Sequence, residues 1–166
     1  MNTRILVALA LCGAALAGCN TPQKAPSEAV PSFYQRLDQG ASLDEQAALE
    51  MINAYRAKNG LAALELDPGL VAQARQRAGS VAATDTSTWG ETPAIAAQKA
   101  SLGSGRAERV SAGYRTLAEA FSGWRDSPPH NRVLLAPNGR RFGIAAVDRP
   151  GAKYRVYWDM IVESGR

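Results

Sequence analysis

The single histidine of this chain, His130, is the side chain best suited to acid–base chemistry. An imidazole titrates near neutral pH, so it can accept or donate a proton under physiological conditions. Ser127 lies three residues earlier and could form a serine–histidine pair. Two prolines separate the pair, however, and the chain has no Gly-x-Ser-x-Gly segment of the kind that presents a nucleophilic serine. We therefore expect Ser127 to cap or turn a loop, and we predict no catalytic residue.

The second residue with distinctive chemistry is Cys19. Residues 1–4 carry a positive charge, and the apolar run at 5–17 is too short to span a bilayer as a mature helix, which is typical of a signal peptide. The sequence LAGC at 16–19 resembles the bacterial lipobox, in which cleavage precedes the cysteine and the cysteine receives acyl chains such as palmitate. Several acyl chains on one residue hold a protein firmly to a membrane. A plain signal peptide with a chance cysteine is the alternative.

We accordingly predict a lipoprotein that is anchored in the cell envelope through Cys19. Asn20 follows the cysteine, in place of the Asp that typically retains such proteins in the inner membrane, so we expect the outer membrane if the cell is Gram-negative. Cys12 would leave with the signal peptide, and the mature chain would then have no disulfide.

The charge balance argues against nucleic acid as a partner. Loss of Arg4 leaves 18 of the 19 basic residues against 15 acidic ones, with no long block of lysine or arginine. That mild excess is typical of solvated surfaces. We predict the membrane as a partner through the acyl anchor, with a lipid, a glycan or an envelope protein as a possible ligand, and we expect a monomer.

The chain divides into three segments in this interpretation. Residues 1–18 are the signal peptide, residues 19–41 a proline-containing tether, and residues 42–166 one folded domain. A capping box that begins at Ser42 predicts a helix that Gly60 ends, and Asp67 with the following proline predicts the start of a second helix.

The remaining helices and strands follow from similar local signals. A short helix is expected at 92–100, and a capping box at Thr116 predicts a helix that ends before Pro128. Alternating apolar residues at 142–147 and 154–160 flank a turn and predict an antiparallel hairpin with one face buried. Helices followed by strands indicate an α+β domain.

Three stretches, in this order, resemble the CAP superfamily of cysteine-rich secretory proteins, antigen 5 and plant pathogenesis-related proteins. Residues 52–67 (INAYRAKNGLAALELD) are similar to its opening segment, residues 107–114 (AERVSAGY) to its Glu-Asn-(Ile/Val) motif, and residues 124–131 (WRDSPPHN) to the Trp…Ser-Pro-x-His motif of bacterial members. The resemblance covers roughly residues 43–162. It implies an α-β-α sandwich with helices packed on a small antiparallel sheet.

The resemblance also implies a surface cleft, which in this family is lined by two histidines and acidic residues and in some members holds a divalent cation. Glu108 and His130 match motif positions, and we expect His130 to hydrogen-bond Glu108. Trp89 stands where the other histidine is expected, and Arg109 replaces the motif asparagine, where it could pair with Glu108. A zinc site usually needs three protein ligands, so we predict neither a metal nor another cofactor, with a cation between Glu108 and His130 as the alternative.

Four more residues complete the predicted cleft. We expect Trp89 and Tyr114 to be exposed aromatics at a groove, and the motif adds Ser127 and Asn131. Because the cleft offers so few metal-binding side chains, we expect the domain to bind a lipid, a cell-wall glycan or a protein rather than to act as an enzyme. A metal-assisted hydrolase with a reduced site and a structural envelope protein with a vestigial cleft are the alternatives.

Overall fold

The computed structural model describes residues 30–84 and 105–165 of the chain. The predicted signal peptide, Cys19, Trp89 and the helix expected at 92–100 lie outside these residues. Among the described residues, no helix combines the length and the apolar character that crossing a membrane requires.

The sheet has four strands in the order β1-β3-β4-β2. Their bounds are Glu65–Leu66 (β1), Arg106–Ala112 (β2), Gly139–Asp148 (β3) and Val156–Ser164 (β4). The hairpin of β3 and β4 is confirmed, and β2 pairs antiparallel with β4. The sheet is mixed rather than purely antiparallel, because the two-residue strand β1 runs parallel to β3 at one edge.

In the described residues, four α-helices and two short 3₁₀ helices pack around the sheet. They are η1 (Ser32–Tyr34), η2 (Leu37–Gln39), α1 (Glu45–Lys58), α2 (Pro68–Thr84), α4 (Leu117–Asp126) and α5 (Pro128–Leu134). The predicted starts of α2 and α4 are confirmed, since Asp67 and Thr116 accept hydrogen bonds from backbone amides of the first turns. The start of α1 was predicted wrongly, because Asp44 rather than Ser42 caps it, by accepting from the Ala47 amide at 2.9 Å.

The loop expected after Pro128 is instead the short helix α5. Both prolines lie in its first turn, where an amide hydrogen is not needed, so they start a helix as readily as they end the previous one. His130 is consequently a helical residue rather than a loop residue.

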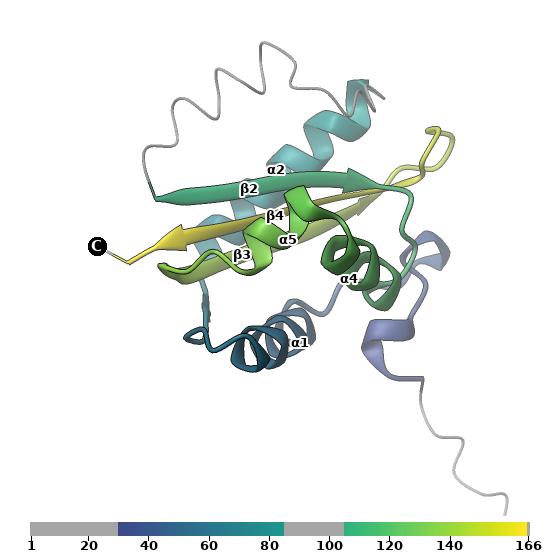
Figure 1. Ribbon diagram of the computed structural model, residues 1–166. Helices are drawn as coiled ribbons and strands as arrows, with labels where there is room; N and C mark the ends of the chain where they lie inside the picture. The colour runs from purple at the N-terminus through teal and green to yellow at the C-terminus, as the bar shows by residue number, and fades with distance from the viewer. Residues whose placement is uncertain (1–29, 85–104, 166) are drawn as a thin grey trace, which may run out of the picture.

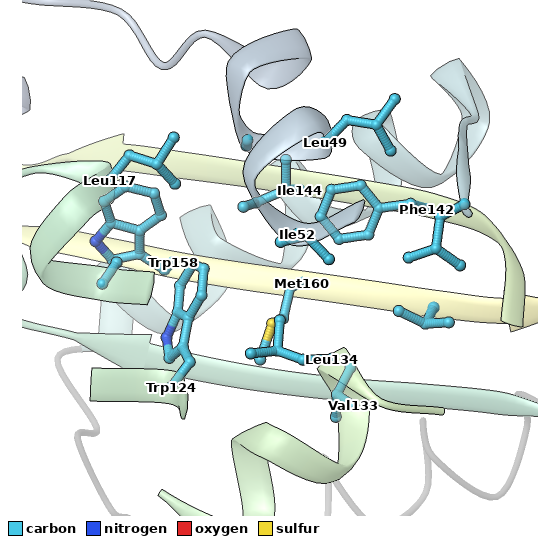
Figure 2. Packing of buried hydrophobic residues seen from close by; sticks show 14 of the residues in the cluster. Leu49, Ile52, Leu117, Trp124, Val133, Leu134, Phe142, Ile144, Trp158 and Met160 are labelled. Atoms are coloured by element: carbon cyan, nitrogen blue, oxygen red, sulfur yellow. The ribbon is translucent and has the colours of Figure 1, made fainter. Parts of the chain in front are cut away.

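The helices form two layers, as predicted for an α-β-α sandwich. Helix α2 covers one face of the sheet, and α1, α4 and α5 cover the other (Figure 1). The larger core lies under the three helices, where the rings of Trp124 and Trp158 meet edge to face with centroids 5.5 Å apart (Figure 2). Both tryptophans are buried, whereas Tyr154, which begins the predicted strand at 154–160, precedes β4 and is only half-buried.

The packed domain begins earlier than the predicted boundary at residue 42. Leu37 is only 6% exposed and belongs to the main core, and Phe33 packs against that core. The Leu37 amide donates to the Arg115 carbonyl at 2.9 Å, which fixes η2 beside the loop between β2 and α4. Part of the segment interpreted as tether is therefore part of the fold.

Candidate functional site

Glu108 and His130 lie on opposite faces of the sheet. Side chains alternate along β2, and the Ser111 hydroxyl accepts from the Trp124 indole of α4 at 2.8 Å, which places odd-numbered residues of β2 toward α4 and α5. Glu108 points the other way, toward α2, where its carboxylate lies 3.6 Å from the Arg77 guanidinium. The predicted hydrogen bond between His130 and Glu108 is therefore wrong, because the sheet separates the two side chains.

His130 is engaged at both ring nitrogens. Its Nε2 lies 3.3 Å from the Val110 carbonyl and its Nδ1 lies 2.9 Å from Ser127 Oγ. A carbonyl oxygen can only accept, so Nε2 carries the proton and Nδ1 accepts from the Ser127 hydroxyl. Burial lowers the pKa of His130, the Val110 contact opposes this, and the charge of Arg109 lowers it further. The imidazole is neutral at pH 7, and it ties α5 to the edge of β2.

The Ser127 hydroxyl donates to His130 Nδ1 and does not cap a helix. Ser127 is the residue before α5, but its side chain makes no capping hydrogen bond, contrary to expectation. The pair has the elements of a serine–histidine dyad, a hydroxyl donating to a neutral imidazole. His130 is only 9% exposed, however, and the Val110 carbonyl covers its second nitrogen. The geometry favours a structural link between α4, α5 and β2.

Glu108 belongs to a ladder of ion pairs on the face of the sheet that α2 covers. Besides Arg77, it contacts Arg106 at 3.3 Å, and Arg106 also lies 3.7 Å from Glu163. Arg141 continues the ladder by pairing with Glu163 and, at 3.0 Å, with Asp67 at the start of α2. Arg109, which was expected to pair with Glu108, extends from the opposite face of β2. The Glu108 carboxylate is thus held between two arginines.

Asp159 is a buried carboxyl group that the sequence did not reveal. It is 0% exposed, and neither carboxylate oxygen has a hydrogen-bond partner. Burial raises the pKa of Asp159 well above its ordinary value, Glu108 raises it further, and the arginines Arg77 and Arg106 oppose the rise. The alternation in 154–160 suggested a solvent-facing position, but α2 covers that face. Desolvation of the charged form is therefore the largest influence on the titration of this group.

The remaining cleft candidates are dispersed. The Tyr114 ring packs against Gly123 of α4 and is half-buried, so it is not the exposed platform that was expected. Asn131 accepts from the Tyr55 hydroxyl at 3.1 Å, which links α5 to α1. Of the cleft candidates that the structure describes, only Ser127, His130 and Asn131 lie together, on and beside α5.

The described residues contain no group of three or more His, Cys, Asp or Glu side chains that could hold a metal ion. Glu108 and Asp159 lie near enough for their charges to interact, but Arg77 and Arg106 lie beside them, and these positive charges disfavour a cation there. The donor set therefore does not fit the divalent cation considered between Glu108 and His130.

Two surface grooves lie near the N-terminal part of the described chain. One, of about 410 Å³, runs between η1 and α1 and is lined by Pro31, Ser32, Phe33, Asp44, Gln46, Ala47, Glu50 and Met51. The other, of about 320 Å³, lies among η2, the start of α1, α2 and β3. The Glu45 and Arg75 side chains, 3.1 Å apart, line the second groove and pair across it. Neither groove includes Glu108 or His130.

Comparison with known proteins identifies the fold. Residues 49–161 match the model of the CAP family, described as the cysteine-rich secretory protein family. An outer surface protein from Borrelia burgdorferi is similar in structure, with a TM-score of 0.56 and 18% identity over 75% of this chain and 98% of that one. The comparison with curated proteins finds no match.

Two further solved structures are longer than the region they share with this chain. An extracellular SCP-domain protein from Bacillus anthracis str. Ames has a TM-score of 0.55 and 19% identity, over 72% of this chain and 40% of that one. A cysteine-rich secretory protein from Staphylococcus aureus has a TM-score of 0.51 and 19% identity, over 80% of this chain and 40% of that one. This chain therefore spans less than half of either protein, and the likeness shows the fold alone.

Proposed function

We propose that this chain, which belongs to the cysteine-rich secretory protein (CAP) family, is an envelope-anchored binding module rather than an enzyme. The supporting observation is that Glu108 and His130 lie on opposite faces of the sheet and are each engaged in contacts that hold helices to it. Reacting groups must converge on one substrate atom, which this separation prevents. Both residues support the fold that presents a binding surface elsewhere.

We place the binding surface in the groove between η1 and α1, because apolar and acidic side chains line it together. Phe33 and Met51 supply apolar area, while Asp44 and Glu50 place carboxylates at its edge. Asp44 is partly committed to capping α1, and Glu50 accepts from Gln46 at 3.1 Å on the exposed surface. Such a groove suits a ligand that combines an apolar group with a positive charge. Among lipid, glycan and protein ligands, a basic amphipathic segment of an envelope protein fits best.

An envelope location is part of this proposal. The LAGC sequence that ends at Cys19 supports it, and so do the similar structures that are named as outer surface and extracellular proteins. Metabolic labelling with an alkyne analogue of palmitate tests the anchor. We expect label in the membrane fraction for the natural sequence and none for Cys19→Ser. Equal labelling of both would remove the anchor from the proposal.

Binding is tested with a defined probe. We expect an amphipathic peptide of leucine and lysine to raise the melting temperature of the purified protein, and Glu50→Lys to abolish the shift. Lys58→Glu, on the same helix but outside the groove, should retain it. A shift that Glu50→Lys leaves unchanged would place the binding surface elsewhere.

Catalysis is tested in parallel. The purified protein, with and without added divalent cations, is assayed with peptide, ester and phosphodiester substrates. We expect no turnover above that of a Ser127→Ala/His130→Ala variant. Turnover that this variant loses would favour a hydrolase that uses the Ser127–His130 contact, and turnover lost only on chelation would favour the metal-assisted alternative.

A further inference from the structure

One end of the molecule combines the point of chain entry with exposed apolar and basic side chains. This end, here called the entry pole, consists of η1, η2, the loop at 113–116 and the hairpin tip at 149–155 (Figure 1). The Asp38 carboxylate connects its parts, lying 2.6 Å from the Arg36 guanidinium and 3.6 Å from that of Arg115. Arg155 of the hairpin tip is close enough for its charge to interact with those of Asp38 and Arg36.

The exposed apolar side chains lie in η1 and just before it. Among the residues that the structure describes, Val30 at 59% and Tyr34 at 57% are the only large hydrophobic side chains classed as exposed. Both lie in one five-residue stretch, and the Tyr34 ring packs against that of Phe33 with centroids 4.6 Å apart. Single exposed hydrophobic residues are ordinary, but a tyrosine at the point of chain entry is a side chain that favours a membrane–water interface.

The pole also carries basic side chains. Arg149, Lys153 and Arg155 lie on the hairpin tip, which has no acidic residue between positions 149 and 155. Arg36 and Arg115 pair with Asp38, and Arg155 pairs with Asp148, while Asp44 and Glu50 line the groove beside η1. The hairpin tip is therefore the basic part of the pole, because its own residues include three basic side chains and no acidic one.

Hydrogen bonds fix the shape of the tip. Arg155 adopts a left-handed backbone conformation with φ of 61°, which is unusual for a residue with a side chain. Its guanidinium is held by both oxygens of Asp148 at 2.9 and 3.3 Å, and the Arg149 amide donates to its carbonyl at 2.7 Å. Arg149 and Lys153 are consequently presented on an ordered turn.

The position of the anchor brings this pole nearest to a lipid surface. Eleven Cα steps separate Cys19 from Val30, which limits their distance to about 40 Å. Strand β3, which ends at the hairpin tip, is ten residues long, so the opposite end of the sheet lies about 33 Å farther away. A tether of this length keeps the entry pole at a high local concentration at the bilayer.

We propose that the entry pole is a membrane-docking surface for anionic phospholipid, with Tyr34 at the level of the headgroups and Arg149 and Lys153 facing the phosphates. This inference rests on the anchoring at Cys19 in the proposed function. Each basic residue near an anionic bilayer adds about 1 kcal/mol of attraction, so two strengthen the docking without replacing the anchor. Docking would fix the orientation in which the groove between η1 and α1 faces its ligand.

Single-cysteine variants test the proposal on the full-length, lipidated protein. The mature chain has no other free thiol, so Tyr34→Cys and Ala152→Cys place a fluorophore at the pole, and Asn138→Cys places one just before β3, at the opposite end of the sheet. The proteins are reconstituted into vesicles of phosphatidylcholine with phosphatidylglycerol and brominated lipid. We expect quenching to be several-fold stronger at the two pole positions than at Asn138→Cys.

A charge reversal separates docking from anchoring. Arg149→Glu with Lys153→Glu should reduce quenching at Tyr34→Cys to the level of Asn138→Cys. Lys58→Glu with Arg132→Glu should leave it unchanged, since the end of α1 contacts residues 134 and 136 at the other end of the molecule. Flotation with the vesicles reports the anchor independently. Protein that floats but shows equal quenching at all three positions would overturn the docking proposal, whereas protein that does not float would overturn the anchor.

Discussion

Asp159→Asn is the substitution whose outcome depends most directly on the charges beneath α2. Asp159 is fully buried without a hydrogen-bond partner, and burial together with Glu108 raises the pKa of its carboxyl group despite Arg77 and Arg106. The folded state therefore binds a proton here more tightly than the unfolded state does. Asparagine has nearly the same shape and cannot ionise, so it removes the titration while leaving the packing in place.

The sign and size of the effect follow from proton linkage. Since the folded-state pKa is raised above 3.8, the free energy of unfolding contributed by this group falls as pH rises through the interval between the two pKa values. The slope is about 1.4 kcal/mol for each pH unit. Above about pH 4, the natural protein should therefore lose stability relative to Asp159→Asn at up to this slope, until the pH passes the folded-state pKa of Asp159.

The assay is urea denaturation of both proteins at several pH values, compared as a difference so that other titrating groups cancel. Asp126→Asn is the control, because Asp126 is exposed and its pKa is lowered by a hydrogen bond from its neighbour Arg125. That control should show a small difference of the opposite sign. If Asp159→Asn were destabilised at pH 7 and unchanged at pH 4, Asp159 would be ionised and paired with the arginines, and the reasoning would be refuted.

Two further substitutions test how the layers are held together. Arg56→Met should lower the free energy of unfolding by about 3 kcal/mol in urea denaturation, because this buried guanidinium donates to the backbone carbonyls of Ala62, Leu134 and Ala136. The control Lys58→Met, at an exposed position of the same helix, should change it by less than about 0.5 kcal/mol. Gly143→Ala should prevent folding or lower the free energy of unfolding by more than about 3 kcal/mol, because the added methyl group would lie 2.5 Å from the Leu70 carbonyl oxygen of α2. In the control Gly79→Ala, the added methyl group has no atom within 4 Å, and the substitution should stabilise α2 by about 0.5 to 1 kcal/mol. A tolerated Gly143→Ala, shown by an unchanged melting temperature, would mean that α2 is not seated on β3 as described.

Local signals in the sequence predicted the elements that depend on local chemistry. The caps at Asp67 and Thr116 and the alternation in the final hairpin each require only neighbouring residues, and all three are confirmed. The short strand β1 escaped prediction because two residues carry no periodicity. Helix α5 escaped because proline both ends a helix and suits the first turn of the next.

The arrangement of the site could not be predicted in the same way. The motif that contains Glu108 was not recognised as a strand, so nothing in the sequence assigned Glu108 to the face of the sheet opposite His130. Asp159 alternates with Trp158 and Met160 as a solvent-facing residue would, and only the cover of α2 on the second face makes it buried. Tertiary packing decides both cases, since it determines which helix lies over which face.

A double-mutant cycle of Glu108→Gln and His130→Gln tests most directly whether these residues act as separate structural supports. The free energy of unfolding is measured by urea denaturation for the natural protein, both single variants and the double variant. Because the sheet separates the two side chains and they share no contact, the two losses should add to within about 0.5 kcal/mol. A coupling energy of about 1 kcal/mol or more would show that Glu108 and His130 interact in one site, and would contradict the proposed binding module.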